Sequence, residues 1–154
     1  MAQRTPQTHD TNCKYLGNCL ELFELIQSHL PTYKIEASKL LKLLVLNYLF
    51  SNGDAHFKNF SVIETSMGDY RLSVAYDLLN SRIHIYNKDF ALDDGLLPKN
   101  LAQGKTGSQF AKLAEQTGIG EKNFKAIMEL MLSKSDLVEK MVATSFLNAT
   151  IKWN

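Results

Sequence analysis

The stretch SNGDAHFKNF, residues 51–60, places four chemically active side chains within six positions of the chain. They are the carboxylate of Asp54, the imidazole of His56, the ammonium of Lys58 and the carboxamide of Asn59. The stretch directly follows an apolar run, KLLKLLVLNYLF, which predicts a buried helix. Taken alone, Asn-Gly-Asp indicates an ordinary helix-terminating turn, because Asn and Gly tolerate left-handed backbone conformations. The stretch becomes a candidate site only if the fold brings further oxygen donors to it.

Two short segments after this stretch, residues 60–64 and 70–74, contain β-branched and aromatic residues and flank the sequence TSMGD. A Gly-containing turn between two such segments predicts a β-hairpin. We expect the turn to be centred between Met67 and Gly68. That centre determines which residues lie opposite each other across the hairpin.

The predicted pairing brings together residues that are far apart in sequence. It places Asn59 opposite Tyr76, with Asp77 one residue from direct register with Asn59, and Asp54 can reach the same place from its tight loop. Asn59 and Asp77 offer the hard oxygen donors that suit Mg²⁺, which proteins commonly hold through one or two side chains, phosphates and water. Asp54 would stand where an attacking hydroxyl transfers or orients its proton. The layout is that of phosphoryl transfer.

The sequences NGDAHFKNF at 52–60 and AYDLL at 75–79 resemble the catalytic core of HipA-type kinases, the toxin half of bacterial toxin–antitoxin pairs. The D-x-H-x-x-N pattern is also similar to the catalytic loop of phosphoinositide lipid kinases. The order of roles parallels that of protein kinases, in which a catalytic Asp is followed by an Asn and then by a metal-binding Asp. The resemblance covers residues 47–80, and the helical remainder fits the carboxyl-terminal lobe of the family.

This resemblance implies a role for each matching residue. Asp54 would be the catalytic carboxylate, Asn59 a Mg²⁺ ligand, and Asp77 the principal Mg²⁺ ligand that bridges the phosphates of ATP. His56 would shape the catalytic loop, and Lys58 would lie near the transferred phosphoryl group, where it serves both catalysis and ATP binding. Outside this resemblance, His56 could be a hydrogen-bonding loop residue without a chemical role, and Lys58 a solvated surface charge.

The rest of the chain predicts the elements that must position these residues. We expect an α+β fold that is mainly α, a helical bundle with one short β-hairpin that carries the active-site loop, like the carboxyl-terminal lobe of a HipA-like kinase. A single domain over residues 1–154 is expected, because the chain shows no repeat, linker or low-complexity tract. The predicted helices cover residues 20–30, 35–50, 108–116, 121–132 and 136–151, with N-caps at Asn18 and Ser135, and a short strand is predicted at 82–86. Apolar stripes at helical spacing predict these core positions: Phe110, Leu113, Ala114, Ile127, Met128, Met131, Val138, Met141, Val142 and Phe146.

The composition argues against several other classes of protein. With 17 Lys and Arg against 16 Asp and Glu, the net charge of +1 gives no electrostatic reason to expect nucleic acid or an anionic membrane as a partner. The strongest apolar run, residues 40–50, is too short to span a bilayer. Cys13 and Cys19 are expected to be reduced thiols of a cytoplasmic protein, and together with His9 they lack a fourth zinc ligand.

Kinases of this family carry an amino-terminal lobe with a glycine-rich phosphate loop and a Lys for the ATP phosphates. The first 50 residues here contain one glycine, Gly17, so we expect the ATP-cradling lobe to be absent. A Walker-like string, GKT at 104–106, lacks its first glycine, because Lys99 stands there. The chain is therefore expected to be a fragment or split kinase completed by a partner chain, weakly active or inactive alone, or else a reduced relative that no longer turns over ATP.

The resemblance implies transfer of the γ-phosphoryl group of Mg·ATP to a protein Ser or Thr. Known acceptors of the family lie on aminoacyl-tRNA synthetases, and the family partner is a DNA-binding antitoxin. A competing hypothesis is a non-catalytic, degenerate kinase lobe that serves as a binding or regulatory module for another chain. The acceptor, the antitoxin interface and the oligomeric state cannot be read from these residues.

Overall fold

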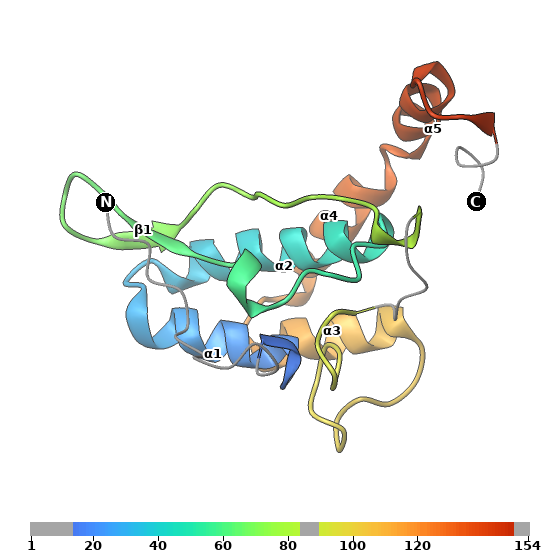
Figure 1. Ribbon diagram of the computed structural model, residues 1–154. Coiled ribbons are helices and arrows are strands. Elements are labelled where there is room, and N and C mark those ends of the chain that lie inside the picture. The colour runs from blue at the N-terminus through green and yellow to red at the C-terminus, as the bar shows by residue number, and fades with distance from the viewer. Residues whose placement is uncertain (1–13, 84–89, 150–154) are drawn as a thin grey trace.

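The computed structural model describes residues 14–83 and 90–149, which form a mainly helical fold with a two-stranded antiparallel hairpin (Figure 1). The predicted α+β fold that is mainly α is confirmed. In chain order the helices and strands are α1 (Cys19–His29), α2 (Tyr33–Leu49), β1 (Val62–Glu64), β2 (Tyr70–Leu72), α3 (Thr106–Gln116), α4 (Glu121–Leu132) and α5 (Ser135–Thr144). Short 3₁₀-helices at Phe57–Asn59 and Ser81–Ile83 lie between α2 and α3.

A capping box starts α1, as the sequence predicts for Asn18. The Asn18 side-chain oxygen accepts a hydrogen bond from the Leu20 N–H at 3.1 Å, and the Glu21 carboxylate accepts one from the Asn18 N–H at 3.2 Å. These bonds satisfy backbone donors that the start of a helix leaves unpaired. The preceding Gly17 has a φ of +98°, and an added Cβ would lie 2.6 Å from the Glu21 carboxylate. Both the left-handed turn and the capping box therefore favour glycine at position 17.

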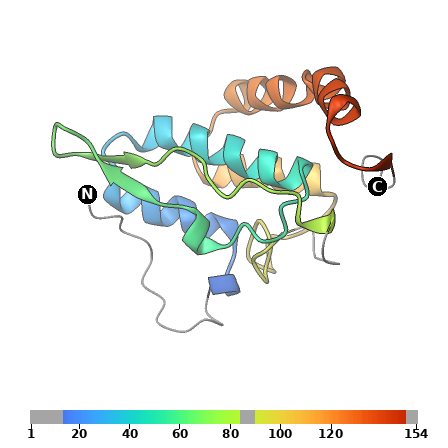
Figure 2. The ribbon, with the colours of Figure 1, turned by 45° about the horizontal axis from the view of Figure 1, so that its top comes forward.

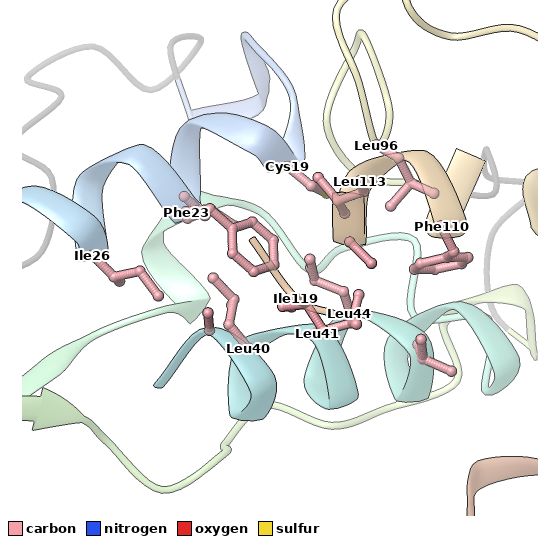
Figure 3. Packing of buried hydrophobic residues seen from close by; sticks show 14 of the residues in the cluster. Cys19, Phe23, Ile26, Leu40, Leu41, Leu44, Leu96, Phe110, Leu113 and Ile119 are labelled. Carbon is pink, nitrogen blue, oxygen red and sulfur yellow. The ribbon is translucent and has the colours of Figure 1, made fainter. Parts of the chain in front are cut away.

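The core surrounds α2, and Figure 3 shows how its side chains meet. α2 packs against α1, α4 and β2, and α3 packs against α4. The loop before α3 adds three buried leucines to this core: Leu92, Leu96 and Leu97. Burial of one such side chain stabilises the fold by about 1.5–3 kcal/mol. Among residues 14–83 and 90–149, no helix is both long enough and apolar enough to cross a membrane.

The hairpin pairs one position away from the predicted register. Ile63 lies opposite Arg71, so the turn is centred on Met67 instead of between Met67 and Gly68. Thr65 is hydrogen-bonded to Asp69, so the loop within TSMGD consists of residues 66–68, an odd number. Its last residue, Gly68, takes the left-handed conformation at φ +82°. An odd loop centres the turn on a residue, which explains the shift.

A buried carboxylate fastens the hairpin to α2. Glu36, which is 2% exposed, accepts a hydrogen bond from the Leu72 N–H at 3.0 Å and forms an ion pair with Lys39 at 2.6 Å. A buried carboxylate that is both paired and hydrogen-bonded avoids the large cost of an isolated buried charge. Glu36 therefore positions β2, and the segment that follows it, against α2.

The structure differs from the predictions in two later segments. Residues 82–83, predicted as strand, belong to the 3₁₀-helix Ser81–Ile83, because Ser81 is hydrogen-bonded to the Ser51 carbonyl through both its N–H and its hydroxyl. The other residues of that predicted strand, 84–86, lie outside the described part of the chain. The last helix ends at Thr144 instead of residue 151, and its N-cap is Lys134 instead of Ser135. At its end, the Ser145 hydroxyl donates to the Val142 carbonyl, an alternative to continuing the helix.

The core prediction is wrong for α5 and the residues that follow it. Met141 is 63% exposed, Phe146 is fully exposed, and α5 contains no buried residue. In Figure 2, α5 extends away from the body that α1, α2 and α3 form. Helical spacing predicts an apolar face, but it does not say whether another element covers that face. The predicted positions in the two preceding helices do lie in the core or pack against it: Phe110, Leu113, Ala114, Ile127, Met128 and Met131.

Candidate active site

A Schellman motif ends α2 and turns the chain into the loop of residues 51–59. The Asn52 N–H donates to the Asn47 carbonyl at 2.8 Å, and the Ser51 N–H donates to the Tyr48 carbonyl at 3.1 Å. Ser51 takes the left-handed conformation at φ 52°, in the position that glycine usually fills. The sequence pointed to Asn52 and Gly53 for this role, and neither has a positive φ. A non-glycine residue in this conformation costs free energy, so the surrounding contacts must hold it there.

The Asn52 side chain is the buried centre of this loop. Its amide donates to the Asn47 side-chain oxygen at 3.0 Å and to the Asp77 backbone carbonyl at 2.9 Å. Its oxygen accepts a longer bond, 3.4 Å, from the Asp54 N–H. Asn52 is 4% exposed, and these contacts satisfy a polar group that would be costly to bury unpaired. One side chain therefore links the end of α2, the start of the loop of residues 51–59 and the segment that carries Asp77.

Ser81 holds the same loop from the other side. Its hydroxyl accepts a hydrogen bond from the Gly53 N–H at 2.8 Å and donates one to the Ser51 carbonyl at 3.1 Å. Ser81 is 3% exposed, so this exchange takes place away from water. The two bonds support the left-handed turn at Ser51.

The carboxylate of Asp54 is half-buried and bonded to a residue that precedes α1. The Tyr15 hydroxyl donates to Asp54 Oδ1 at 2.8 Å. Lys14 places its Nζ 4.5 Å from the centre of the Tyr15 ring, and a hydrogen bond with the Tyr15 side chain raises the pKa of Lys14, with Asp54 adding to the effect. Lys14 therefore stays cationic beside the pair of Tyr15 and Asp54.

His56 is built into the wall of the loop. The residue is 8% exposed, and its ring meets the Tyr15 ring edge-on with centroids 5.3 Å apart. Its Nδ1 is buried and has no hydrogen-bond partner among the described residues. The His56 N–H donates to Asn59 Oδ1 at 3.1 Å, which closes the short 3₁₀-helix Phe57–Asn59. This placement fits a residue that shapes the loop.

Lys58 is exposed, and its backbone is used more than its side chain. The Tyr76 hydroxyl donates to the Lys58 carbonyl at 2.9 Å, which ties the segment after β2 to the loop of residues 51–59. The part of Lys58 that could contact a ligand is its ammonium group, at the end of a flexible side chain. The predicted role of Lys58 near a phosphoryl group stays a prediction.

Asn59 and Asp77, predicted to meet across the hairpin, are in direct contact. Asn59 Nδ2 donates to Asp77 Oδ2, although the two residues are 18 positions apart. Asn59 is 9% exposed, whereas Asp77 lies in an exposed segment and takes the left-handed conformation at φ 55°. Asp and Asn are the non-glycine residues that reach this region most readily. The contact forms despite the register error, because Asp77 lies beyond the paired residues and the left-handed turn directs it to Asn59.

The donor set of Asn59 and Asp77 fits Mg²⁺ that is shared with phosphates. Asp77 supplies a carboxylate, and rotation of the Asn59 amide would present an oxygen beside it, at the cost of the bond to the His56 N–H. Among the described residues no three His, Cys, Asp or Glu side chains cluster as a metal site. A cation here would thus depend on two side chains, phosphate oxygens and water, which is the usual way that Mg²⁺ is held.

Sequence reasoning missed three residues of this site. The sequence indicates only a turn residue at Asn52, although this residue stands inside the NGDAHFKNF motif. Ser81 follows the AYDLL segment closely, but an isolated serine carries no pattern. Tyr15 lies 39 positions before Asp54, and nothing in the sequence connects the two. Such contacts depend on tertiary packing, which periodicity and turn chemistry do not describe.

Two comparisons with known proteins bear on this arrangement. The family model described as HipA-like C-terminal domain matches residues 2–141. A protein named "Putative kinase Y4dM", from Sinorhizobium fredii (strain NBRC 101917 / NGR234), is 31% identical over 93 residues. The aligned region covers 60% of this chain and 22% of that relative. The chain thus aligns with about a fifth of the relative's length.

Proposed function

Because this chain belongs to the family of HipA-like C-terminal domains, we propose that it is the catalytic lobe of a serine/threonine protein kinase. The observation that supports the proposal best is the contact of Asn59 with Asp77 beside the loop that carries Asp54. In this proposal the lobe transfers the γ-phosphoryl group of ATP to a protein hydroxyl. The transfer depends mostly on positioning and charge neutralisation.

Each residue then has one task. Asp77 and Asn59 would hold Mg²⁺, which neutralises charge on the phosphates when bound. Asp54 would accept or orient the proton of the attacking hydroxyl. His56 keeps the loop in shape from its buried position, and Lys58, at the exposed surface of the loop, would attract the transferred phosphoryl group.

An amino-terminal lobe, either from the same protein or from a partner chain, would supply the rest of the nucleotide-binding site. Residues 1–154 would form the carboxyl-terminal domain. The acceptor would be a Ser or Thr of a bacterial protein in the cytoplasm, such as an aminoacyl-tRNA synthetase. By analogy with the family, a DNA-binding antitoxin would be the regulatory partner.

A second candidate function is favoured by α5. This helix has no buried residue, and Leu137 and Met141 are more than half exposed. An apolar helix face of this kind fits a lobe that binds another chain without catalysis. Nucleotide binding separates the two candidates, because a binding module has no need of Mg·ATP.

Isothermal titration calorimetry with Mg·ATP tests the proposal, with and without an amino-terminal lobe of the family. We expect the lobe to restore binding, Asp77→Ala to abolish it, and the exposed Asp136→Ala on α5 to leave it unchanged. Asp54→Ala should bind Mg·ATP nearly as well as wild type but lose about 10²–10⁴-fold in phosphate transfer, since a positioned base contributes that much. Absence of binding in every combination, or equal loss of binding and transfer in Asp54→Ala, would contradict the proposal.

A further inference from the structure

Tyr15 contacts two residues of the catalytic loop at once, from a segment far away in sequence. Its hydroxyl donates to Asp54 Oδ1 at 2.8 Å, and its ring meets the buried His56 ring at a centroid distance of 5.3 Å and an interplanar angle of 63°. The hydroxyl and the ring thus make separate contacts, one polar and one apolar. A Phe at this position would keep the second contact and remove the first.

The backbone around Tyr15 is itself held in place. The Asp93 N–H donates to the Tyr15 carbonyl at 2.8 Å, and the Asp94 N–H donates to the Gly17 carbonyl at 3.0 Å. The loop that supplies these donors is anchored in the core by Leu92 and Leu96, which are 2% and 0% exposed. Tyr15 is therefore presented to Asp54 by a segment that is attached to the core.

We propose that Tyr15 is a positioning residue for Asp54, an inference that rests on the proposed kinase function. A half-buried carboxylate on a loop can rotate about its side-chain torsions, and only some of the resulting orientations suit proton transfer. The hydrogen bond from Tyr15 engages Oδ1 and fixes the plane of the carboxylate. Oδ2 is then the oxygen left for the acceptor hydroxyl. Tyr15 touches neither the nucleotide nor the acceptor in this proposal and acts through Asp54 alone.

The predicted consequence is a loss in the chemical step without a loss in nucleotide binding. Tyr15→Phe, in the protein with its amino-terminal lobe, should lower kcat by about tenfold or more. The reason is that even a small misorientation of the Asp54 carboxylate lowers the rate of the chemical step strongly. The KM for ATP and the calorimetric affinity for Mg·ATP should stay within about twofold of wild type, since Asn59 and Asp77 are untouched. The matched control is Tyr33→Phe. The Tyr33 hydroxyl donates to the Thr117 carbonyl at 2.9 Å and is also part-buried, but it lies away from the loop.

A second measurement separates positioning from a merely structural effect. In the Asp54→Ala background, Tyr15→Phe should cause no further loss of the residual transfer rate, because its target carboxylate is gone. A Tyr15→Phe protein that transfers phosphate at the wild-type rate, or a loss in kcat that Tyr33→Phe shows equally, would overturn the inference while the kinase proposal stands. A wild-type protein that neither binds Mg·ATP nor transfers phosphate would overturn both.

Discussion

The two segments that meet at the candidate active site are held in different ways. Residues 51–59 are buried or half-buried except for Lys58, and backbone and side-chain hydrogen bonds fix most of this loop. Residues 74–80, which carry Asp77, are all exposed. This second segment is tied to the first by the bonds from Asn52, from Asn59 and from the Tyr76 hydroxyl.

From this difference we expect the backbone of the proposed base, Asp54, to be locally more stable than that of the proposed metal ligand, Asp77. The loop with Asp54 is mostly buried or half-buried and packs against the core, so we expect it to open only when much of the fold opens. The segment with Asp77 can separate locally, because few buried apolar contacts would be lost. A base needs fixed geometry, whereas a metal ligand can adjust to a nucleotide as it enters and leaves.

The largest expected effect concerns Cys19, which lies in the core beneath the loop and lines a small cavity together with Asn47 and Asn52. Burial raises the pKa of this thiol from 9.0 to about 12, with a further contribution from Glu21. The reactive thiolate is then about a thousandfold scarcer at pH 8 than in the unfolded chain. In a Cys13→Ser variant, labelling of native Cys19 by a disulfide reagent at pH 8 should be slower by at least this factor than labelling in urea.

The same pKa shift predicts a pH dependence of stability. The unfolded chain loses the Cys19 proton near pH 9.0, while the folded chain keeps it until about pH 12. The stability due to the neutral thiol is thus complete below pH 9 and falls as the pH rises toward 12. Chemical denaturation should show a steeper decline in the Cys13→Ser variant than in the variant that also carries Cys19→Ala, because the tyrosines and lysines that titrate in this range are common to both. If Cys19 in the native protein were labelled at a rate within about tenfold of the rate in the unfolded chain, the core beneath residues 51–59 would have to open readily.

A smaller effect is expected from Asn52→Ala, which removes the side chain that joins both segments. The substitution leaves the buried Asn47 side chain and the Asp77 carbonyl without their donor, at a cost of about 2–4 kcal/mol in the free energy of unfolding. Urea denaturation followed by circular dichroism measures this change. Asn80→Ala serves as the matched control, because Asn80 is exposed in the second segment and should change stability by less than about 0.5 kcal/mol. Equal losses in the two variants would remove the contrast between loop and segment.

The sequence predicted elements whose signals are local. The helix at Glu121–Leu132 was placed correctly because Gly120 and the polar residues after Leu132 mark its ends, and Asn18 caps α1 through a recognisable capping box. The contact between Asn59 and Asp77 followed from hairpin pairing, and it tolerated a register error of one residue because Asp77 lies outside the paired strands.

What the sequence could not supply are contacts between segments without a shared pattern. Tyr15 reaches Asp54 only because the loop around Leu92 and Leu96 packs into the core and binds the segment before α1. The exposure of Met141 is of the same kind, since an apolar stripe does not reveal whether a neighbour covers it. Tertiary placement decides both cases.

The smallest expected effect is that of Tyr76→Phe, on the exposed side of the site. The Tyr76 hydroxyl bonds to the Lys58 carbonyl at 2.9 Å, but the residue is 38% exposed, so water can replace the lost partner. We expect a loss of less than about 1 kcal/mol in the free energy of unfolding by urea denaturation. Faster amide hydrogen exchange should be confined to Ser73 and Ser81, the hydrogen-bonded amides that flank residues 74–80, because the bond that is lost ties only that segment to the loop. A loss above about 2 kcal/mol, or faster exchange throughout α2, would show that residues 74–80 are as much a part of the cooperative core as residues 51–59.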